Sequence, residues 1–399
     1  MTFPKDFIGK KILIYGFGKT GKSVHYFLNR NKINHFIWDD DLISKKKNFD
    51  KNYFKKKFDF IILSPGVDIY HHKRKNFFLS HKNKIITDLD IFFNLGKNFK
   101  YVIGVTGTNG KSSFCNLLHQ ILKKNKIKSQ ILGNFGLPVL NSKVTKNKYY
   151  IIELSSYQID YSKSLKLDSA CILNISPDHL ERHATFSDYK RIKFKIFNFL
   201  KEKKVGFYSK KISNKYSIKN CKSFKKIDNN FINKLLNLKL KINLNNFKIK
   251  NLEHRNELFL KKYNFNFIND SKSTNFDASL YAIQKFNNIF LVLGGFLKSG
   301  DRYKINKILQ KKIIKIFIIG QKIKKLTGEL KKQKIKFIYL ENITKVINYF
   351  LLNDFKIYKK KKQDYNFLFS PGAASFDQFS NFEDRGKKFK NIVLNAFKR

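Results

Sequence analysis

An apolar run that leads into a glycine-rich turn with a lysine constrains the fold of this chain more than any other feature. Residues 101–105 are mostly apolar and continue into the sequence GVTGTNGKSS, which spans residues 104–113. The final GKS is typical of a phosphate loop, in which glycines free backbone N–H donors, the lysine reaches the β- and γ-phosphates, and the serine hydroxyl binds Mg²⁺. Gly104 stands six residues before Gly110, one more than in the strict pattern. We interpret the segment as an ATP site rather than as a structural turn.

Seven other short apolar runs are each followed by glycine or polar residues and then by a helical pattern. Buried parallel strands that alternate with helices produce this rhythm. The sequence therefore predicts an α/β fold with more than one sheet. The runs cover residues 11–15, 60–63, 149–154, 170–174, 289–293, 313–319 and 365–369.

Two stretches without motifs suggest where one domain ends and the next begins. The segment 201–250 is rich in lysine and asparagine and separates two blocks that are dense in motifs. Residues 94–100 precede the strand that begins at Tyr101. The length of 399 residues also suits two or three domains. We predict domains over residues 1–97, 98–252 and 253–399.

The charge of the chain is strongly unbalanced, with 82 Lys+Arg against 29 Asp+Glu and a formal net charge of +53. Such an excess often indicates a polyanion partner. Only eight of the cations are arginines, which leaves 82 − 8 = 74 lysines. A surface that reads nucleic acid would normally use arginine forks as well. Because Phe, Lys, Ile and Asn are all frequent, we attribute the charge to A/T-rich codons and expect no nucleic-acid partner.

Cysteine usage and hydropathy indicate a cytoplasmic protein. The three cysteines give neither a disulfide framework nor a CxxC metal spacing, which fits a reducing compartment. No apolar run reaches 18 residues, and residues 1–11 have no apolar segment after their lysines. We expect no membrane insertion.

A second glycine turn, GFGKTG at residues 16–21, follows the first predicted strand, and Asp39, Asp40 and Asp41 come about twenty residues later. Such a turn lets backbone N–H groups approach a pyrophosphate at a helix N-terminus. One interpretation is a nucleotide or nucleotide-sugar site, with residues 64–66 closing a neighbouring strand. The other is a tight turn without a ligand, and the sequence leaves both open.

Polar clusters also follow several other predicted strands. Glu153 ends one strand and is the candidate metal partner of Ser112, although an ordinary strand-end glutamate is the alternative. His179 lies in a cluster after the next strand. The last third of the chain has three clusters that between them combine acids, lysines and hydroxyls: residues 269–275, Gly294 to Lys298 and residues 370–379. Together they suit the binding of a carboxylate-bearing substrate. Each one taken separately could instead serve in helix capping and turns.

Taken in order, these motifs resemble the Mur ligase family, and residues 269–275 and 370–382 resemble its D-glutamate-adding branch. The resemblance implies an α/β protein of three domains: an N-terminal Rossmann-like domain for UDP, a central P-loop ATPase domain, and a C-terminal Rossmann-like domain for the amino acid. It implies a monomeric, ATP-dependent, amide-forming ligase of peptidoglycan synthesis. The small-molecule substrates would be UDP-N-acetylmuramoyl-L-alanine and D-glutamate, with ATP and Mg²⁺ as cofactors.

The resemblance also implies roles in binding ATP and metal. Ser112 and Glu153 would bind one Mg²⁺. His179 and Glu153 would bind a second with Lys193, which matches a lysine that the family carries as a carbamate. Lys111, His179, Lys193 and Lys298 form the expected catalytic set. The expected ATP contacts are Gly107, Thr108, Asn109, Gly110, Lys111, Ser112, Ser113, Asn230, Asn233, Arg255 and Asp270.

Further positions are expected to contact the two substrates. The UDP-substrate contacts would be Lys19, Thr20, Asp39, Ser64, Pro65, Gly66 and Asn134. The D-glutamate contacts would be Lys272, Thr274, Lys298, Ser375 and Phe382. The chain departs from the family in having Asn229 where the adenine-site motif HNxxN begins with histidine.

Other functions stay open at this point. Within the same enzyme class, the alternatives are a sister ligase that adds another amino acid and a folylpolyglutamate synthase, although the first glycine turn argues against folate. From different classes, they are a basic nucleic-acid-binding ATPase and an NAD dehydrogenase. The dehydrogenase is disfavoured because it would leave the phosphate loop without a use.

Overall fold

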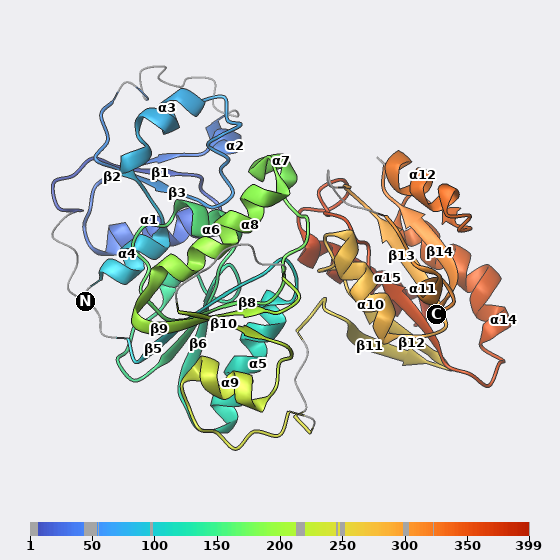
Figure 1. Cartoon of the computed structure of the whole chain (residues 1–399). Coiled ribbons are helices and arrows are strands. Elements are labelled where there is room, and N and C mark those ends of the chain that lie inside the picture. Colours follow the sequence, from blue (N-terminus) through green and yellow to red (C-terminus); the bar gives the residue numbers. More distant parts are fainter. Residues whose placement is uncertain are drawn as a thin grey trace. The chain divides into compact units, whose positions relative to one another are not determined.

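The computed structural model of the chain contains three sheets (Figure 1). It divides into two compact units, residues 1–175 with 182–249 and residues 250–399 with 176–181. The predicted α/β fold is confirmed, whereas the domain boundaries near residues 97 and 252 stay predictions. The residues that the structure describes are 7–43, 54, 56–95, 99–212, 220–244, 246–247, 252–297, 303–321 and 323–398.

The first sheet has the order β2-β1-β3-β4, and all of its strands are parallel. The strands are β1 Ile12–Tyr15, β2 His35–Trp38, β3 Phe60–Leu63 and β4 Ile85–Ile86. The helices of this region are α1 Lys19–Arg30, α2 Asp40–Ile43, α3 Lys75–Ser80, the 3₁₀ helix η3 Lys82–Lys84 and α4 Asp88–Asn94.

The second sheet has the order β10-β9-β8-β5-β7-β6, again with parallel pairing throughout. Its strands are β5 Tyr101–Thr106, β6 Ser129–Gly133, β7 Tyr149–Glu153, β8 Leu167–Ile172, β9 Leu200–Ser209 and β10 Cys221–Phe224. Its helices are α5 Lys111–Lys124, η4 Val139–Asn141, α6 Ser156–Tyr161, α7 Leu180–His183, α8 Phe186–Phe194, η5 Lys195–Phe199 and α9 Asn229–Leu236.

The third sheet has the order β11-β12-β16-β13-β14-β15, in which only the pairing of β11 with β12 is antiparallel among the described strands. Its strands are β11 Glu257–Lys262, β12 Phe265–Asn269, β13 Ile289–Gly294, β14 Ile313–Ile319, β15 Ile338–Tyr339 and β16 Tyr365–Phe369. Its helices are α10 Phe276–Lys285, α11 Lys307–Gln310, α12 Lys324–Lys332, α13 Ile343–Tyr349, the π helix η6 Phe350–Phe355, α14 Lys356–Tyr358 and α15 Phe382–Ala396.

Central strands are apolar along their whole length because both faces of each sheet are covered. In β5, Val102 enters one hydrophobic core and Ile103 and Val105 enter the other. In β13, Phe290 and Leu291 likewise enter separate cores. A continuous apolar run is what a parallel strand buried on both faces requires. The carboxyl ends of these strands therefore stay available for polar loops.

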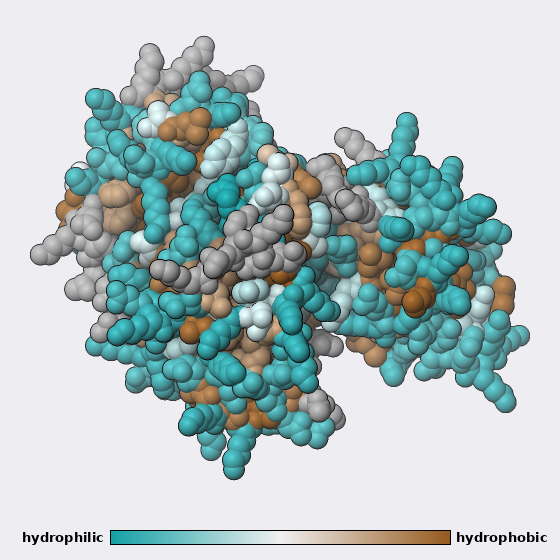
Figure 2. All heavy atoms as spheres, viewed as in Figure 1, coloured by the Kyte–Doolittle hydropathy of each residue, from teal (hydrophilic) through white to brown (hydrophobic). Residues whose placement is uncertain are grey.

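The surface is dominated by hydrophilic residues, as Figure 2 shows for the face in view. In the part of the chain that the structure describes, no helix combines the length and the apolar character needed to cross a bilayer. Cys115 on α5 and Cys171 on β8 are buried, and Cys221 on β10 is half-buried. Burial raises the pKa of both Cys171 and Cys221, and that of Cys221 reaches about 11.

Candidate active site

The glycine-rich segment forms a turn between β5 and α5, as predicted. Gly110 precedes the first residue of α5 and has a φ of +80°, a left-handed conformation that favours glycine. The Nζ of Lys111 donates to the carbonyl oxygens of Gly107, at 2.9 Å, and Thr108, at 2.8 Å. The helix N-terminus and this ammonium place positive charge at one point, which suits a polyphosphate.

A buried carboxylate lies beside the first turn of α5. Glu153, the last residue of β7, is 2% exposed. Its Oε2 accepts a hydrogen bond from the Ser112 hydroxyl, and its Oε1 accepts one from Asn134 Nδ2 at 2.8 Å. Because β5 and β7 are neighbours in the sheet, their carboxyl ends bring the two residues together. A hydroxyl and a carboxylate are hard oxygen donors of the kind that Mg²⁺ prefers.

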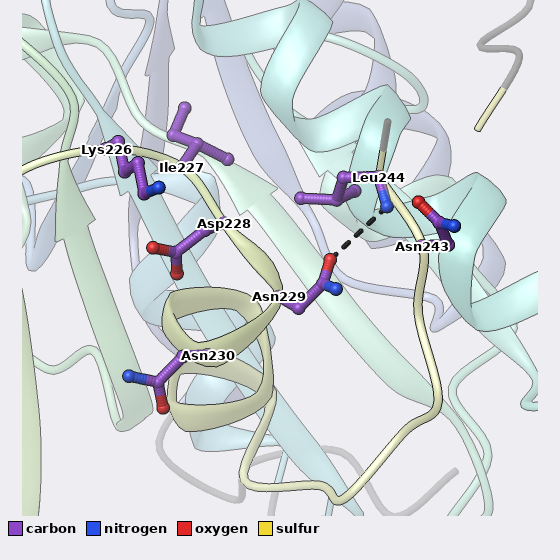
Figure 3. Close-up of a pocket in the computed structure, with 7 residues that line it drawn as sticks. All are labelled: Lys226, Ile227, Asp228, Asn229, Asn230, Asn243 and Leu244. Atoms are coloured by element: carbon purple, nitrogen blue, oxygen red, sulfur yellow. Dashed lines mark hydrogen bonds between the residues drawn. The ribbon is translucent and has the colours of Figure 1, made fainter. Parts of the chain in front are cut away.

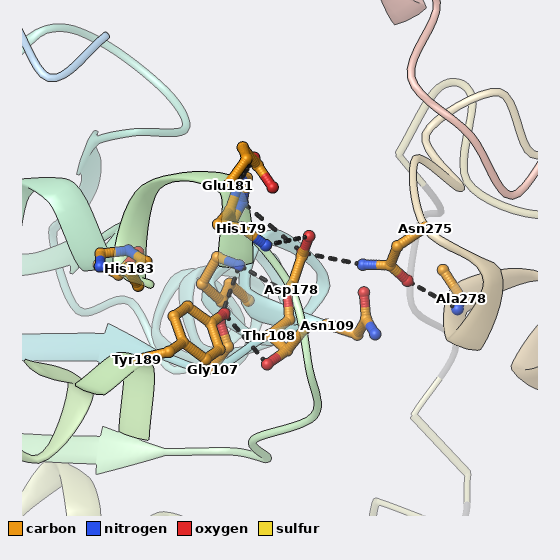
Figure 4. Close-up of polar contacts among 12 residues, drawn as sticks. Gly107, Thr108, Asn109, Asp178, His179, Glu181, His183, Tyr189, Asn275 and Ala278 are labelled. Atoms are coloured by element: carbon orange, nitrogen blue, oxygen red, sulfur yellow. Dashed lines mark hydrogen bonds and ion pairs between the residues drawn. The ribbon is translucent and has the colours of Figure 1, made fainter. Parts of the chain in front are cut away.

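Lys193 reaches the same turn from α8. It is 1% exposed, and its Nζ donates to the Gly107 carbonyl oxygen at 2.9 Å. Tyr189, one turn earlier, has its hydroxyl 3.2 Å from the Thr108 hydroxyl oxygen (Figure 4). An ammonium has no lone pair for a metal, so Lys193 fits a metal site only as a carbamate.

His179 lies on the segment 176–181, which belongs to the unit formed by the C-terminal residues. Its backbone has a φ of 56°. Its ring nitrogens lie 3.6 Å from Asp178 Oδ2 and 3.5 Å from Glu181 Oε1. Asp178 also accepts a hydrogen bond from Asn275 Nδ2 at 3.0 Å (Figure 4). Among the described residues, no group of three or more His, Cys, Asp or Glu side chains is arranged to hold a metal ion.

The turn between β1 and α1 is built differently from the phosphate loop. Gly16 has a φ of +90°, and a Cβ on Gly21 would lie 2.0 Å from the Gly16 carbonyl oxygen. The Phe17 N–H donates to Asp39 Oδ2 at 2.6 Å. Lys19 is exposed in the first turn of α1, and Thr20 follows it. The Asp39 carboxylate therefore accepts a hydrogen bond from a backbone N–H group that the sequence pattern had suggested for binding a pyrophosphate.

Hydrogen bonds connect the neighbouring segment 64–66 to the first glycine turn and to Arg182. The Ser64 hydroxyl donates to the Gly16 carbonyl oxygen at 2.7 Å. The Pro65 carbonyl oxygen accepts a hydrogen bond of 2.9 Å from Arg182, whose other terminal nitrogen donates to Val67 O at 2.6 Å. These bonds hold the segment against the first glycine turn and against α7.

Sequence reasoning missed an ionic cluster centred on Asp40, although it had noted the three consecutive aspartates. Asp40 accepts hydrogen bonds from Tyr15 OH at 2.8 Å and Arg74 Nη1 at 2.6 Å. The Arg74 guanidinium lies over the rings of Trp38, at 4.4 Å, and Phe54, at 4.5 Å. Burial opposes ionisation, yet hydrogen bonds from Tyr15, Trp38 and other donors hold the pKa of Asp40 well below its usual range.

The two asparagines expected at the adenine, Asn230 and Asn233, differ in their surroundings. Asn233 Nδ2 donates to the Leu240 carbonyl oxygen at 3.0 Å, and its Oδ1 accepts from the Leu240 N–H at 2.9 Å. Both ends of this amide therefore bind backbone. Asn230 instead lines a pocket of about 400 Å³ (Figure 3). The residues around this pocket are Lys226, Ile227, Asp228, Asn229, Asn230, Asn243 and Leu244.

Of the residues expected around D-glutamate, Lys272 and Thr274 lie in the loop after β12, Ser375 lies in the loop after β16, and Phe382 is the first residue of α15. Lys272 Nζ lies 3.7 Å from the centroid of the Phe382 ring. Thr274 is half-buried in the same loop as Lys272, and Ser375 is 2% exposed. Lys298 lies outside the described residues. The structure thus brings together the loops after β12 and β16, and the contact of Lys298 with D-glutamate stays a prediction.

Asp270, expected at the nucleotide, is buried at the end of β12. Its Oδ2 accepts from the Ser370 hydroxyl at 2.7 Å, and its Oδ1 accepts from the Asn256 N–H at 3.1 Å. Burial raises the pKa of Asp270 to about 6, and these hydrogen bonds and the charge of Arg255 oppose the rise. Arg255 is half-buried one residue after His254, which is 3% exposed.

Comparisons with known proteins agree with this architecture. Residues 105–294 match the Mur ligase middle domain. Over 96% of its length the chain is 32% identical to the UDP-N-acetylmuramoylalanine--D-glutamate ligase of Francisella tularensis subsp. mediasiatica, 95% of which is covered. The chain belongs to the Mur ligase family. The corresponding ligase of Francisella philomiragia is also 32% identical, with 96% of both chains covered.

Solved Mur ligases share the fold at low sequence identity. The MurF ligase of Thermotoga maritima in complex with ADP aligns over 88% of this chain and 94% of its own, with a TM-score of 0.56 and 16% identity. In the present chain, hydrogen bonds at the middle sheet form two sets: Lys111 and Lys193 both donate to the Gly107 carbonyl oxygen, and Ser112 and Asn134 both donate to Glu153.

Proposed function

We propose that this chain is an ATP-dependent ligase that adds D-glutamate to UDP-N-acetylmuramoyl-L-alanine in peptidoglycan synthesis. The similarity to relatives of that name extends over nearly the whole chain. The observation that carries the proposal is the joint placement of Lys111, Ser112 and Glu153 at the carboxyl ends of β5 and β7. A nucleotide-driven reaction needs such a cation, hydroxyl and carboxylate around a triphosphate.

In this proposal, the middle sheet binds ATP. Lys111 would turn from the carbonyl oxygens of its own loop to the β- and γ-phosphates. Ser112 and Glu153 would hold one Mg²⁺, which when bound neutralises charge on the phosphates. Lys193, as a carbamate, would offer oxygen atoms to a second Mg²⁺, together with His179 and Glu153. Asn230, from the wall of the pocket at α9, is the remaining candidate for the adenine.

The reaction would proceed through an acyl phosphate. A carboxylate is a poor acyl donor because its oxygen is a bad leaving group. Transfer of the γ-phosphoryl group to the alanyl carboxylate forms the acyl phosphate and releases ADP. The amine of D-glutamate then attacks the carbonyl carbon, the C–O bond to phosphate breaks, and the amine loses a proton as the amide forms. Lys111 stabilises the negative charge that gathers on the phosphoryl oxygens.

The C-terminal loops would bind the amino acid. D-Glutamate carries two carboxylates, and Lys272 supplies a cation beside the Phe382 ring. The hydroxyls of Thr274 and Ser375 can donate to carboxylate oxygens. Lys298 would add a second cation. The proposed contacts of the UDP substrate are Lys19, Thr20, Asp39, Asn134 and the segment 64–66.

A phosphate-release assay tests the proposed activity. Purified full-length chain is incubated with ATP, Mg²⁺, UDP-N-acetylmuramoyl-L-alanine and D-glutamate, and each component is omitted in turn. We expect release that needs all of them. Parallel reactions with L-glutamate, L-alanine and a diamino acid separate this function from that of a sister ligase. Release that does not depend on D-glutamate would overturn the proposal.

A further inference from the structure

One of the few arginines of the chain is almost completely buried in the C-terminal unit. Arg385 lies in the first turn of α15 and is 1% exposed. With 74 lysines against eight arginines, the composition favours lysine wherever a simple positive charge suffices. A guanidinium differs in presenting several N–H groups in a rigid plane. A buried arginine in this background therefore marks a place where that plane is used.

The Arg385 guanidinium donates to two loops at once. Its Nε and Nη2 donate to Ser271, to the hydroxyl oxygen at 3.0 Å and to the carbonyl oxygen at 2.8 Å. Its Nη1 donates to the carbonyl oxygens of Ala373, at 3.0 Å, and Ala374, at 3.2 Å. The Ser271 hydroxyl in turn donates to the Phe382 carbonyl oxygen at 2.8 Å. A lysine, with all its donors on one nitrogen, could not reach these acceptors together.

The clamped loops are those that carry the proposed amino-acid contacts. Ser271 immediately precedes Lys272, and Ala374 immediately precedes Ser375. The loops follow β12 and β16, which pair side by side. A third loop joins them, since the Phe296 N–H donates to the Ala374 carbonyl oxygen at 2.9 Å and the Phe296 carbonyl oxygen accepts from the Ala374 N–H at 3.0 Å. The Arg385 guanidinium thus ties the loops after β12 and β16 to each other, and backbone hydrogen bonds at Ala374 add the loop after β13.

We propose that Arg385 is a positioning residue that sets the spacing between Lys272 and Ser375 and thereby the affinity for the amino-acid substrate. The inference rests on the proposed function. Arg385 does not contact the substrate, because its donors face the loops. Its charge is buried near Asp377 and Asp270, and burial lowers its pKa to about 10, so it stays a cation at neutral pH. A misplacement of about 1 Å can reduce rate or binding about 100-fold.

Arg385→Lys tests this inference because it keeps the positive charge and removes the planar guanidinium group. We expect the KM for D-glutamate to rise about 10- to 100-fold. The KM for ATP and for the UDP substrate should change less than about twofold, and kcat at saturating D-glutamate less than about threefold. The matched control is Arg191→Lys, since the Arg191 side chain is 66% exposed and forms a surface ion pair with Asp188 three residues earlier. The control should leave every constant unchanged.

A second variant covers the case in which Arg385→Lys does not fold. Ser271→Ala removes the acceptor of Nε and keeps the carbonyl oxygen that accepts from Nη2. We expect a KM rise for D-glutamate of about 3- to 10-fold, with circular dichroism and the urea midpoint close to those of the wild type. Equal rises in the KM of all three substrates, or an unchanged KM for D-glutamate in a folded variant, would overturn the inference. Wild-type chain without D-glutamate-dependent turnover would instead refute the proposed function.

Discussion

The two glycine turns of the chain look alike in sequence and differ in structure. Each connects a buried central strand to a helix, β1 to α1 and β5 to α5. In the first, Asp39 places a carboxylate on the backbone N–H of Phe17. In the second, Lys111 lies over the turn and Ser112 binds Glu153. The backbone N–H of the first turn is thus bonded to a carboxylate of the chain, whereas the second turn carries the Lys111 ammonium.

This difference teaches that charge beside a glycine turn decides which part of a nucleotide it suits. A carboxylate repels a phosphate but accepts hydrogen bonds from hydroxyl and N–H groups. The first turn therefore suits the sugar or base of a UDP substrate, and the second suits the triphosphate of ATP. Substitutions in both turns and at Glu153 test this division.

Lys111→Ala should have the largest effect. Removing the cation from the phosphate loop should lower kcat by about 1000-fold or more, because stabilisation of the phosphoryl oxygens is lost. Phosphate release under saturating substrates measures this change. Lys19→Ala, in the corresponding part of the first turn, is the control and should mainly affect the KM of the UDP substrate. Similar losses of kcat in both variants would contradict the division.

Glu153→Gln should follow in size. The amide keeps the shape but loses the negative charge that a divalent cation requires, so kcat should fall by about 100-fold. The Mg²⁺ concentration needed for half-maximal activity should rise in the same variant. Titration of Mg²⁺ at fixed ATP measures both quantities. An unchanged Mg²⁺ dependence would remove Glu153 from the proposed metal site.

Gly21→Ala and Gly110→Ala compare the two turns by stability. A Cβ at Gly21 would meet the Gly16 carbonyl oxygen at 2.0 Å, so we expect the free energy of unfolding to fall by about 1–3 kcal/mol. A Cβ at Gly110 meets nothing within 4 Å, and only its left-handed backbone is strained, for about 1–2 kcal/mol. Urea denaturation of both variants gives the order, and a larger loss for Gly110→Ala would be evidence against it.

Asp39→Asn should have the smallest effect. The amide oxygen can still accept from the Phe17 N–H, and the longer bond of 3.0 Å from the Asp41 N–H to Asp39 Oδ1 is the one that is lost, so the turn between β1 and α1 should keep its shape. The lost charge should raise the KM for the UDP substrate by only about 3- to 10-fold, in line with a charged hydrogen bond becoming a neutral one. The KM for ATP should stay constant, and steady-state kinetics with each substrate varied in turn checks both expectations.

Local patterns in the sequence predicted strands β5, β7 and β8 of the middle sheet, whereas no strand was predicted at β6, β9 or β10. The start of α5 at Lys111 and the meeting of Ser112 with Glu153 follow from glycine spacing and from the rule that parallel strands end at one edge. Contacts set by tertiary packing were not predicted. The use of the Asn233 amide by Leu240, the bond from Phe17 to Asp39, and the clamp of Arg385 each join segments whose approach no local pattern encodes.

The cysteines have a practical consequence for labelling experiments. Maleimides and related electrophiles react with the thiolate, and a raised pKa keeps a thiol protonated at neutral pH. Cys115 and Cys171 are buried, and Cys221 is half-buried with a pKa of about 11. A cysteine introduced at an exposed position outside the proposed site, such as Lys123 in the last turn of α5, would therefore react far faster than the native thiols.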